Sequence, residues 1–480
     1  MQDRLRTLSL ATAATLAALI SMTGCGDDGG TSTPGPDSTS AAAAPDLGFA
    51  VTPSAYGDPW SGALDAAAQA PPVAQFLARG IASADKLSGD LASPASDLAA
   101  QLTGLLATHV YATGSAVSTV YATEQKSPQA EAAWAAVETN SRTLIQLVES
   151  LEAEAAGEGK GGGKGLSRGA DTPPPTSPPA NPSDKGKGDK KTPSPAPTAT
   201  EPPFDLDDYD FGKAWREHVA LLTDYALAAR GENTADQKTA RRELDTWRLQ
   251  AGQYFREITK GRISSSAVRA DLGRYLDAMT EAINGIAGRE GESFVALREG
   301  ADEMPEITAR LAAGLASATD RTGSVTDDAA ELRNQLTATL TGHSYLAVLS
   351  FQVAFAQPGK AGLVSANYRR VQISLDDNSK QIAAQVRELG GPVKEAEFLQ
   401  GWRIHLRDLE NYARSLQAGD LAGRRTATDA LNTYLGTVST FFKGITGGAI
   451  DPANADKRLR AQLAAMIGVV DALQGAFHPS

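Results

Sequence analysis

The chain contains one long stretch twice, and this repeat constrains its fold more than any other feature. Residues 77–111 and 311–345 align without a gap at an offset of 234, and fifteen of the thirty-five positions are identical. Alanine-rich sequences align easily by chance, so the informative identities are polar and aromatic, among them His109/His343. The repeat predicts a duplicated domain with the same internal layout in each copy.

A second repeated stretch supports the same interpretation. Residues 211–225 recur as 398–412 at an offset of 187, with Phe, Trp, Arg, His and Tyr at equivalent places. The two histidines are 109 residues apart in the first copy and 62 apart in the second. The difference equals the 47 residues of segment 157–203, so we interpret this segment as an insertion into one copy.

The inserted segment has the composition of a disordered linker. It contains GKGGGKG, PPPTSPP and KGKGDKK and no apolar periodicity, so it is predicted to lack a packed core. Its glycine-rich part is not expected to bind phosphate as a P-loop does, because no Ser or Thr follows the lysine and no strand precedes it.

Apolar residues elsewhere recur with helical spacing, and no stretch alternates strictly with β-branched residues. The short connections between long helices favour antiparallel bundles. We therefore expect an all-α fold of two tandem antiparallel helical-bundle domains that arose by internal duplication. The expected helices cover approximately residues 73–87, 94 onward, 128–156, 207–230, 234–259, 264–290, 304–320, 326–356, 360–389, 393–417, 422–445 and 452–477.

The N-terminus carries the features of a bacterial lipoprotein signal. Arg4 and Arg6 precede an apolar run over 8–20, which is too short to span a membrane, and Cys25 follows soon afterwards. This arrangement resembles a lipobox, with Met22 where the motif prefers Leu, Val or Ile. The resemblance implies cleavage before Cys25 and its lipidation; an ordinary signal peptide with an incidental cysteine is the alternative.

Composition shifts divide the remainder of the chain. Residues after Cys25 are rich in Gly, Ser, Thr, Pro, Ala and Asp, which predicts a disordered tether. The expected organisation is a signal peptide over 1–25, a tether over 26–71, a first bundle over 72–156 and 204–295 interrupted by the linker 157–203, and a second bundle over 302–478.

The overall charge narrows the classes of partner. A formal net charge of −12 and a pI near 5.1 argue against nucleic-acid binding, which needs a basic face. Cys25 is the single cysteine, so the chain has no intrachain disulfide and no thiolate cluster.

Four of the five histidines lie at matching points of the two repeats, and these are His109, His218, His343 and His405. Helical spacing places each of them on an apolar face, so we expect them to point into the core. Asparagines at 140 and 378 also match, and a core-facing Asn could hydrogen-bond a neighbouring imidazole and select its tautomer.

Two interpretations of the histidines stay open. In the first, each is a buried residue whose hydrogen bonds set the register of a bundle. In the second, the two histidines of each domain bind copper, zinc or b-type haem, with Glu217, Asp224 or Asp408 as additional ligands. No paired ExxH, HExxH or CxxCH motif supports the second interpretation. No GxSxG motif or Ser/His/Asp order points to nucleophilic catalysis, so the sequence favours a non-catalytic protein without a cofactor.

The elements His109–Tyr111, Asn–Ser and Phe398–His405 with Tyr412 are similar to those of bacterial helical proteins of no settled function, whose repeats read E-H-V-Y-L and W-R-x-H-I. The Glu of that pattern is replaced by Thr108 and Gly342 here. We therefore expect a lipid-anchored binding or scaffold protein of the bacterial cell envelope, outside the cytoplasm, with an envelope protein or the cell wall as partner; the alternative is a histidine-based metal, copper or haem module.

Overall fold

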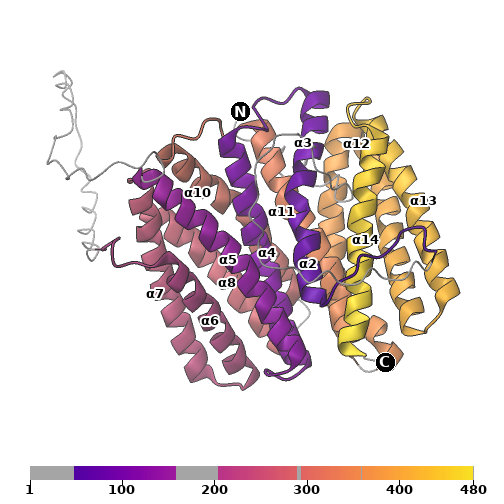
Figure 1. Cartoon of the computed structure of the whole chain (residues 1–480), viewed down its shortest axis with the longest axis horizontal. Helices are drawn as coiled ribbons and strands as arrows, with labels where there is room; N and C mark the ends of the chain where they lie inside the picture. Colours follow the sequence, from indigo (N-terminus) through magenta and orange to yellow (C-terminus); the bar gives the residue numbers. More distant parts are fainter. Residues whose placement is uncertain (1–47, 158–203, 289–292, 358, 479–480) are drawn as a thin grey trace, which may run out of the picture.

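The computed structural model describes residues 48–157, 204–288, 293–357 and 359–478 (Figure 1). The predicted signal peptide, the lipidation site Cys25, the first part of the tether and the linker from residue 158 onward lie outside these ranges. The described residues form helices joined by turns and contain no strand, which confirms the all-α class. None of these helices is both long enough and apolar enough to cross a bilayer.

The helices follow the predicted order closely. They are α2 (Pro59–Ala68), α3 (Ala70–Asp85), α4 (Pro94–Ala122), α5 (Pro128–Ala156), α6 (Phe211–Arg230), α7 (Thr234–Ile258), α8 (Ser265–Gly288), α9 (Ser293–Asp302), α10 (Met304–Ala318), α11 (Asp328–Phe355), the 3₁₀ helix η1 (Gly359–Val364), α12 (Ala366–Gln417), α13 (Leu421–Ile445) and α14 (Pro452–Phe477). Gly391, with φ +77°, interrupts α12 at the Gly-Gly-Pro sequence predicted to separate two helices.

Side-chain caps start the long helices where the sequence predicts. The hydroxyl of Ser93 accepts a hydrogen bond from the backbone N–H of Ser96, and the hydroxyl of Ser127 accepts one from Ala130. Ser365 caps α12 in the same way. Each hydroxyl satisfies one of the N–H groups that a helix start leaves without a partner.

Two helices correct the prediction, because α9 is absent from the expected helices and α2 forms within the expected tether. Residues 59–68, which the sequence assigns to the tether, form α2, and Val51 and Trp60 belong to the hydrophobic core. The expected end of the tether at residue 71 is therefore wrong, because the described structure is packed from Phe49 onward. Small residues dominate this region, and their burial depends on α14, which is about 400 residues away in the sequence.

The centre of the molecule is the pair formed by α4 and α11, which pack against each other more extensively than most other helices (Figure 1). Both helices are buried on nearly all sides. Tyr111 and Tyr345 stack on each other at their contact, with ring centroids 5.7 Å apart and planes at 9°. These tyrosines are equivalent positions of the repeat, so the two copies meet with equivalent surfaces facing.

The helix before each central helix packs on the central helix of the other copy. Helix α3 lies mainly on α11, whereas its counterpart α10 lies mainly on α4. Helix α2 likewise packs mainly on α14, and its counterpart α9 on α8. In Figure 1 the N-terminal helices accordingly lie beside the C-terminal ones. This reciprocal packing favours an internal duplication, and the boundary between the two expected domains stays a prediction.

Candidate functional site

The structure brings the four repeated histidines together as two pairs. His109 on α4 lies beside His218 on α6, with ring centroids 5.1 Å apart. His343 on α11 lies beside His405 on α12 at 5.6 Å. All four side chains are at most 2% exposed, which confirms that they point into the core.

A tyrosine completes the first pair. The Nε2 atoms of His109 and His218 are 3.3 Å apart, and the hydroxyl of Tyr275 on α8 lies 2.9 Å from the first and 3.2 Å from the second. Trp247 stacks on His218 at 4.3 Å, and Trp215 covers His109 at 5.0 Å. Two nitrogens and one oxygen therefore converge inside an aromatic shell.

The hydrogen bonds of the first pair define one consistent proton arrangement. Nδ1 of His218 is 2.6 Å from the carbonyl oxygen of Trp215, so this nitrogen carries the proton and Nε2 is an acceptor. The hydroxyl of Tyr275 then donates to His218 Nε2 and accepts from the Nε2–H of His109. Of the four nitrogens of these two imidazoles, only Nδ1 of His109 lacks a partner among the described residues, and in this arrangement it carries a lone pair and no proton. We assign this tautomer because the alternative would bury an unpaired N–H.

Burial keeps the imidazoles neutral. It lowers the pKa of His109 and of His343 to about 3, and the Asn378 amide partly opposes the effect on His343. The pKa values of His218 and His405 fall well below their ordinary value, first through burial and then through the neighbouring imidazole. Removing a charged ring from water is unfavourable here because no carboxylate of the described residues faces it.

The second histidine pair, His343 and His405, has no tyrosine hydroxyl equivalent to that of Tyr275. The position equivalent to Tyr275 is Gln462, whose amide donates to the hydroxyl of Ser344 at 3.1 Å. Tyr434 stacks on His405 at 4.8 Å, in the place that Trp247 takes in the first pair, and its buried hydroxyl has no partner in the described part of the chain. The two pairs therefore share their location but differ in chemistry.

The matched asparagines have a different main role from the one expected. The amide of Asn140 donates to the backbone carbonyl of Leu105 at 3.1 Å, and that of Asn378 donates to Thr339 at 3.3 Å. Both carbonyls lie one turn before a histidine, so each asparagine ties its helix to the central pair. Asn378 also lies beside His343, without completing a well-aligned hydrogen bond to it.

The geometry limits what the histidines could hold. Among the described residues no group of three His, Cys, Asp or Glu side chains could coordinate a metal ion. Of the expected additional ligands, Glu217 and Asp224 are exposed. Tyr275 is the only third donor that the described structure brings to His109 and His218. A haem would need a cavity, and four cavities of about 490 to 680 Å³ in the described part of the chain are lined by residues other than these imidazoles.

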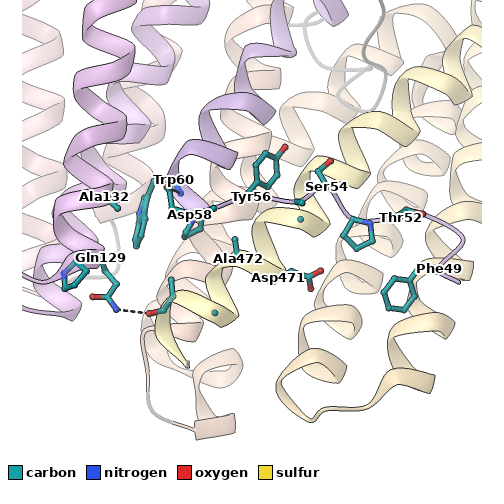
Figure 2. Close-up of a pocket in the computed structure, with 18 residues that line it drawn as sticks. Phe49, Thr52, Ser54, Tyr56, Asp58, Trp60, Gln129, Ala132, Asp471 and Ala472 are labelled. Carbon is teal, nitrogen blue, oxygen red and sulfur yellow. Dashed lines mark hydrogen bonds between the residues drawn. The ribbon is translucent and has the colours of Figure 1, made fainter. Parts of the chain in front are cut away.

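A cavity of about 650 Å³ lies elsewhere, where the N-terminal segment crosses α14 (Figure 2). Aromatic and acidic side chains line it, including Phe49, Tyr56, Trp60, Asp58 and Asp471, and no lysine or arginine is among its lining residues. Figure 2 shows Asp471 between Trp60 at one end and Phe49 at the other. We call it the acidic cavity.

Asp471 is the distinctive group of the acidic cavity. Burial raises its pKa to about 6, although Tyr412 donates hydrogen bonds to both carboxylate oxygens at 2.9 and 3.1 Å and Arg424 lies nearby. Burial also raises the pKa of Asp65 close to the cavity, with Asp58 adding to the shift. The lining of the cavity therefore contains carboxylates and no cation, and Arg424 lies outside the lining, near Asp471 and over the ring of Phe49.

The sequence did not point to Tyr275 or to the cavity. Tyr275 is absent from the repeat because its equivalent is Gln462, so a search for matched residues passes over it. The equivalence of Trp247 and Tyr434 at the same offset of 187 was a usable signal for the aromatic shell. The cavity forms between segments whose contact no local pattern encodes.

Comparison with known proteins adds no assignment: no family model, no curated protein and no solved structure matches this chain.

Proposed function

We propose that the protein is a lipid-anchored, non-catalytic binding protein of the bacterial cell envelope, and that the acidic cavity binds a small organic ammonium compound. The observation that carries this proposal is Asp471, a part-buried carboxylate in a cavity with aromatic walls and no lining cation. An ammonium group paired with Asp471 would gain a charge-assisted hydrogen bond, and Tyr56 would offer its ring face.

The anchor gives this binding site a location. Cys25 is the lipidation site that the signal sequence implies, and 22 residues separate it from Gly48. A chain of that length spans at most about 75 Å, so the bundle would stay near the bilayer. Metabolic labelling with palmitate tests the anchor: the wild-type chain takes up label and pellets with membranes, and Cys25→Ser does neither. A labelled Cys25→Ser variant, or an unlabelled wild-type protein, would refute it.

The first repeat suggests a substitution that tests Asp471 as the ligand-binding residue. Tyr225 and Asn284 are equivalent to Tyr412 and Asp471, and Asn284 donates to the tyrosine hydroxyl at 2.9 Å. Asp471→Asn therefore removes the charge from the acidic cavity while a hydrogen bond to Tyr412 can persist.

Calorimetric titration tests the proposal with phenethylamine and choline as probes and phenylacetate as the charge-reversed control. We expect an ammonium probe to bind and phenylacetate not to bind. Asp471→Asn should weaken binding about tenfold or more, the effect of losing a charge-assisted hydrogen bond. Affinity should rise between pH 5 and 7, because the carboxyl with a pKa of about 6 must lose its proton to pair with a cation. Equal affinities of wild type and Asp471→Asn would exclude this site.

A second candidate function is metal binding at His109, His218 and Tyr275. The donor atoms are separated by 2.9–3.3 Å, and ligands about 2.0–2.1 Å from a tetrahedral zinc ion lie about 3.3 Å apart. The bond from His218 Nδ1 to the Trp215 carbonyl is the kind that orients a metal-bound imidazole. Copper or zinc would fit these donors, with a single ion per chain because repeat two has Gln462 in place of Tyr275.

Metal analysis of the purified protein after incubation with zinc or copper distinguishes this candidate from a purely structural role. One equivalent of metal that is lost in His218→Ala and retained in His405→Ala would support it. Metal-free protein with an unchanged visible spectrum, in which both variants only lower the melting temperature, would exclude it.

A further inference from the structure

A second cavity, of about 490 Å³, occupies the position in repeat two that corresponds to the acidic cavity. The acidic cavity lies at the starts of α2 and α5, and the second lies at the starts of their counterparts α9 and α12. The ends of the equivalent helices α14 and α8 also line them, and the second cavity has further lining residues from α4, α6 and α11. The duplication that the sequence predicts would therefore have produced two cavities at equivalent places.

The described lining residues of the two cavities differ in charge. The second is lined by Arg230 and Arg370, and no aspartate or glutamate is among its described lining residues. Arg370 corresponds to Ala132 of the acidic cavity at an offset of 238, and Arg230 corresponds to Gln417 at an offset of 187. Both arginines therefore stand where the other repeat has a neutral residue, in a chain whose formal net charge is −12. We call this the basic cavity.

Contacts fix the position of both guanidinium groups. Arg230 donates to the carbonyl of Val120 at 2.6 Å and lies over the ring of Tyr121. Arg370 donates to the side-chain oxygen of Asn367 at 2.9 Å. The contacts of both arginines with described residues are to carbonyl oxygens, an amide oxygen and a ring, and none is to a carboxylate, so their charges are available to an anion.

Polar groups around the cavity add donors. Ser118, which is 7% exposed, also lines the cavity and brings a hydroxyl to it. The start of α12 also faces the cavity through Ser365, Ala366 and Asn367. Backbone N–H groups in the first turn of a long helix favour an anion, and phosphate is the group such sites commonly bind.

We propose that the basic cavity binds a small phosphate-bearing anion. Two guanidinium groups from different helices, a helix start and the hydroxyl of Ser118 suit a group with several acceptor oxygens and more than one negative charge. The phosphate could belong to a soluble compound or to a lipid headgroup, and both present the same chemistry to Arg230 and Arg370.

Binding of inorganic phosphate and glycerol phosphate to the full chain, measured by calorimetry, tests the proposal. We expect saturable binding that weakens as salt concentration rises. Arg370→Ala places alanine where the first repeat has Ala132, and it should weaken phosphate binding at least tenfold. Arg230→Gln should do the same, and its melting temperature must be followed because this side chain also holds the end of α4 in place.

Vesicles containing phosphatidylglycerol distinguish the two sources. If the wild-type protein binds these vesicles but not the soluble compounds, and Arg370→Ala abolishes vesicle binding, the ligand is a lipid headgroup. If the wild-type protein binds the soluble compounds, the ligand is a free phosphate compound. Absence of both, or equal binding by wild type and Arg370→Ala, overturns the proposal. Asp471→Asn should leave phosphate binding unchanged, so failure of the ammonium proposal and failure of this one are separate results.

Discussion

Removal of the Tyr275 hydroxyl is the most direct perturbation of the first histidine pair. In wild type this hydroxyl lies 2.9 Å from His109 Nε2 and 3.2 Å from His218 Nε2, in a core with no solvent access to either ring. Tyr275→Phe leaves one buried donor and one buried acceptor without their partner. An unpaired buried polar group costs about 1–3 kcal/mol.

The arrangement of the two rings reduces that cost. Their Nε2 atoms are 3.3 Å apart, so the His109 N–H can turn its hydrogen bond to the free acceptor of His218. We therefore expect Tyr275→Phe to lower the free energy of unfolding by about 1–2 kcal/mol, toward the lower part of the range for an unpaired buried group.

Tyr434→Phe is the matched control. Tyr434 is also a buried tyrosine in contact with a repeated histidine, but its hydroxyl has no partner among the described residues. Its removal should leave stability unchanged or raise it, because an unsatisfied buried hydroxyl is lost. Urea unfolding followed by circular dichroism measures both variants. Equal effects of Tyr275→Phe and Tyr434→Phe, or a Tyr275→Phe variant as stable as wild type, would refute the assigned hydrogen bonds.

Three further outcomes are expected. Burial lowers the pKa of His109 from 6.5 to about 3, so the unfolded chain binds more protons than the folded chain between these pH values. The free energy of unfolding should therefore fall as pH decreases through this window, by about 1.4 kcal/mol per pH unit for each such imidazole. Urea unfolding midpoints at pH 5 and 7 measure this change. Gly342→Ala should destabilise by about 1–3 kcal/mol, because its Cβ would lie 2.8 Å from the hydroxyl of Tyr111; a melting temperature equal to that of wild type would contradict it. Gly468→Ala should displace the N-terminal segment, because its Cβ would lie 2.2 Å from the carbonyl oxygen of Ser54; limited proteolysis near residue 54 should accelerate, and an unchanged cleavage rate would argue against the close contact.

Local sequence patterns were sufficient for the individual helices. The starts at Pro94, Pro128 and Pro452 follow a Ser or Asp cap, and the structure has each helix beginning there. Helical spacing also predicted that His109 and His218 face the core, because residues three and four apart share one face. Helix α2 was missed since its alanine-rich sequence resembles the adjoining segment and its packing partner is distant in the chain.

The candidate sites depended on longer-range contacts. The repeat offset identified four histidines, but it could not identify Tyr275, whose equivalent is Gln462. The role expected for the matched asparagines was incomplete for a related reason: which carbonyl lies opposite Asn140 depends on the axial register of α5 against α4. Helical periodicity gives the face of a residue and leaves that register undetermined.

The sequence by itself determined the all-α class, the positions of most helices and the interior position of the repeated imidazoles, because these follow from interactions within a few residues. Tertiary structure alone decided that α3 packs on α11 and α10 on α4, that a tyrosine joins one histidine pair, and that the described lining residues of two cavities are acidic in one and basic in the other. The physical reason is that hydrophobic burial is not directional, so an apolar helix face can be satisfied by either copy of its partner until the whole chain is packed.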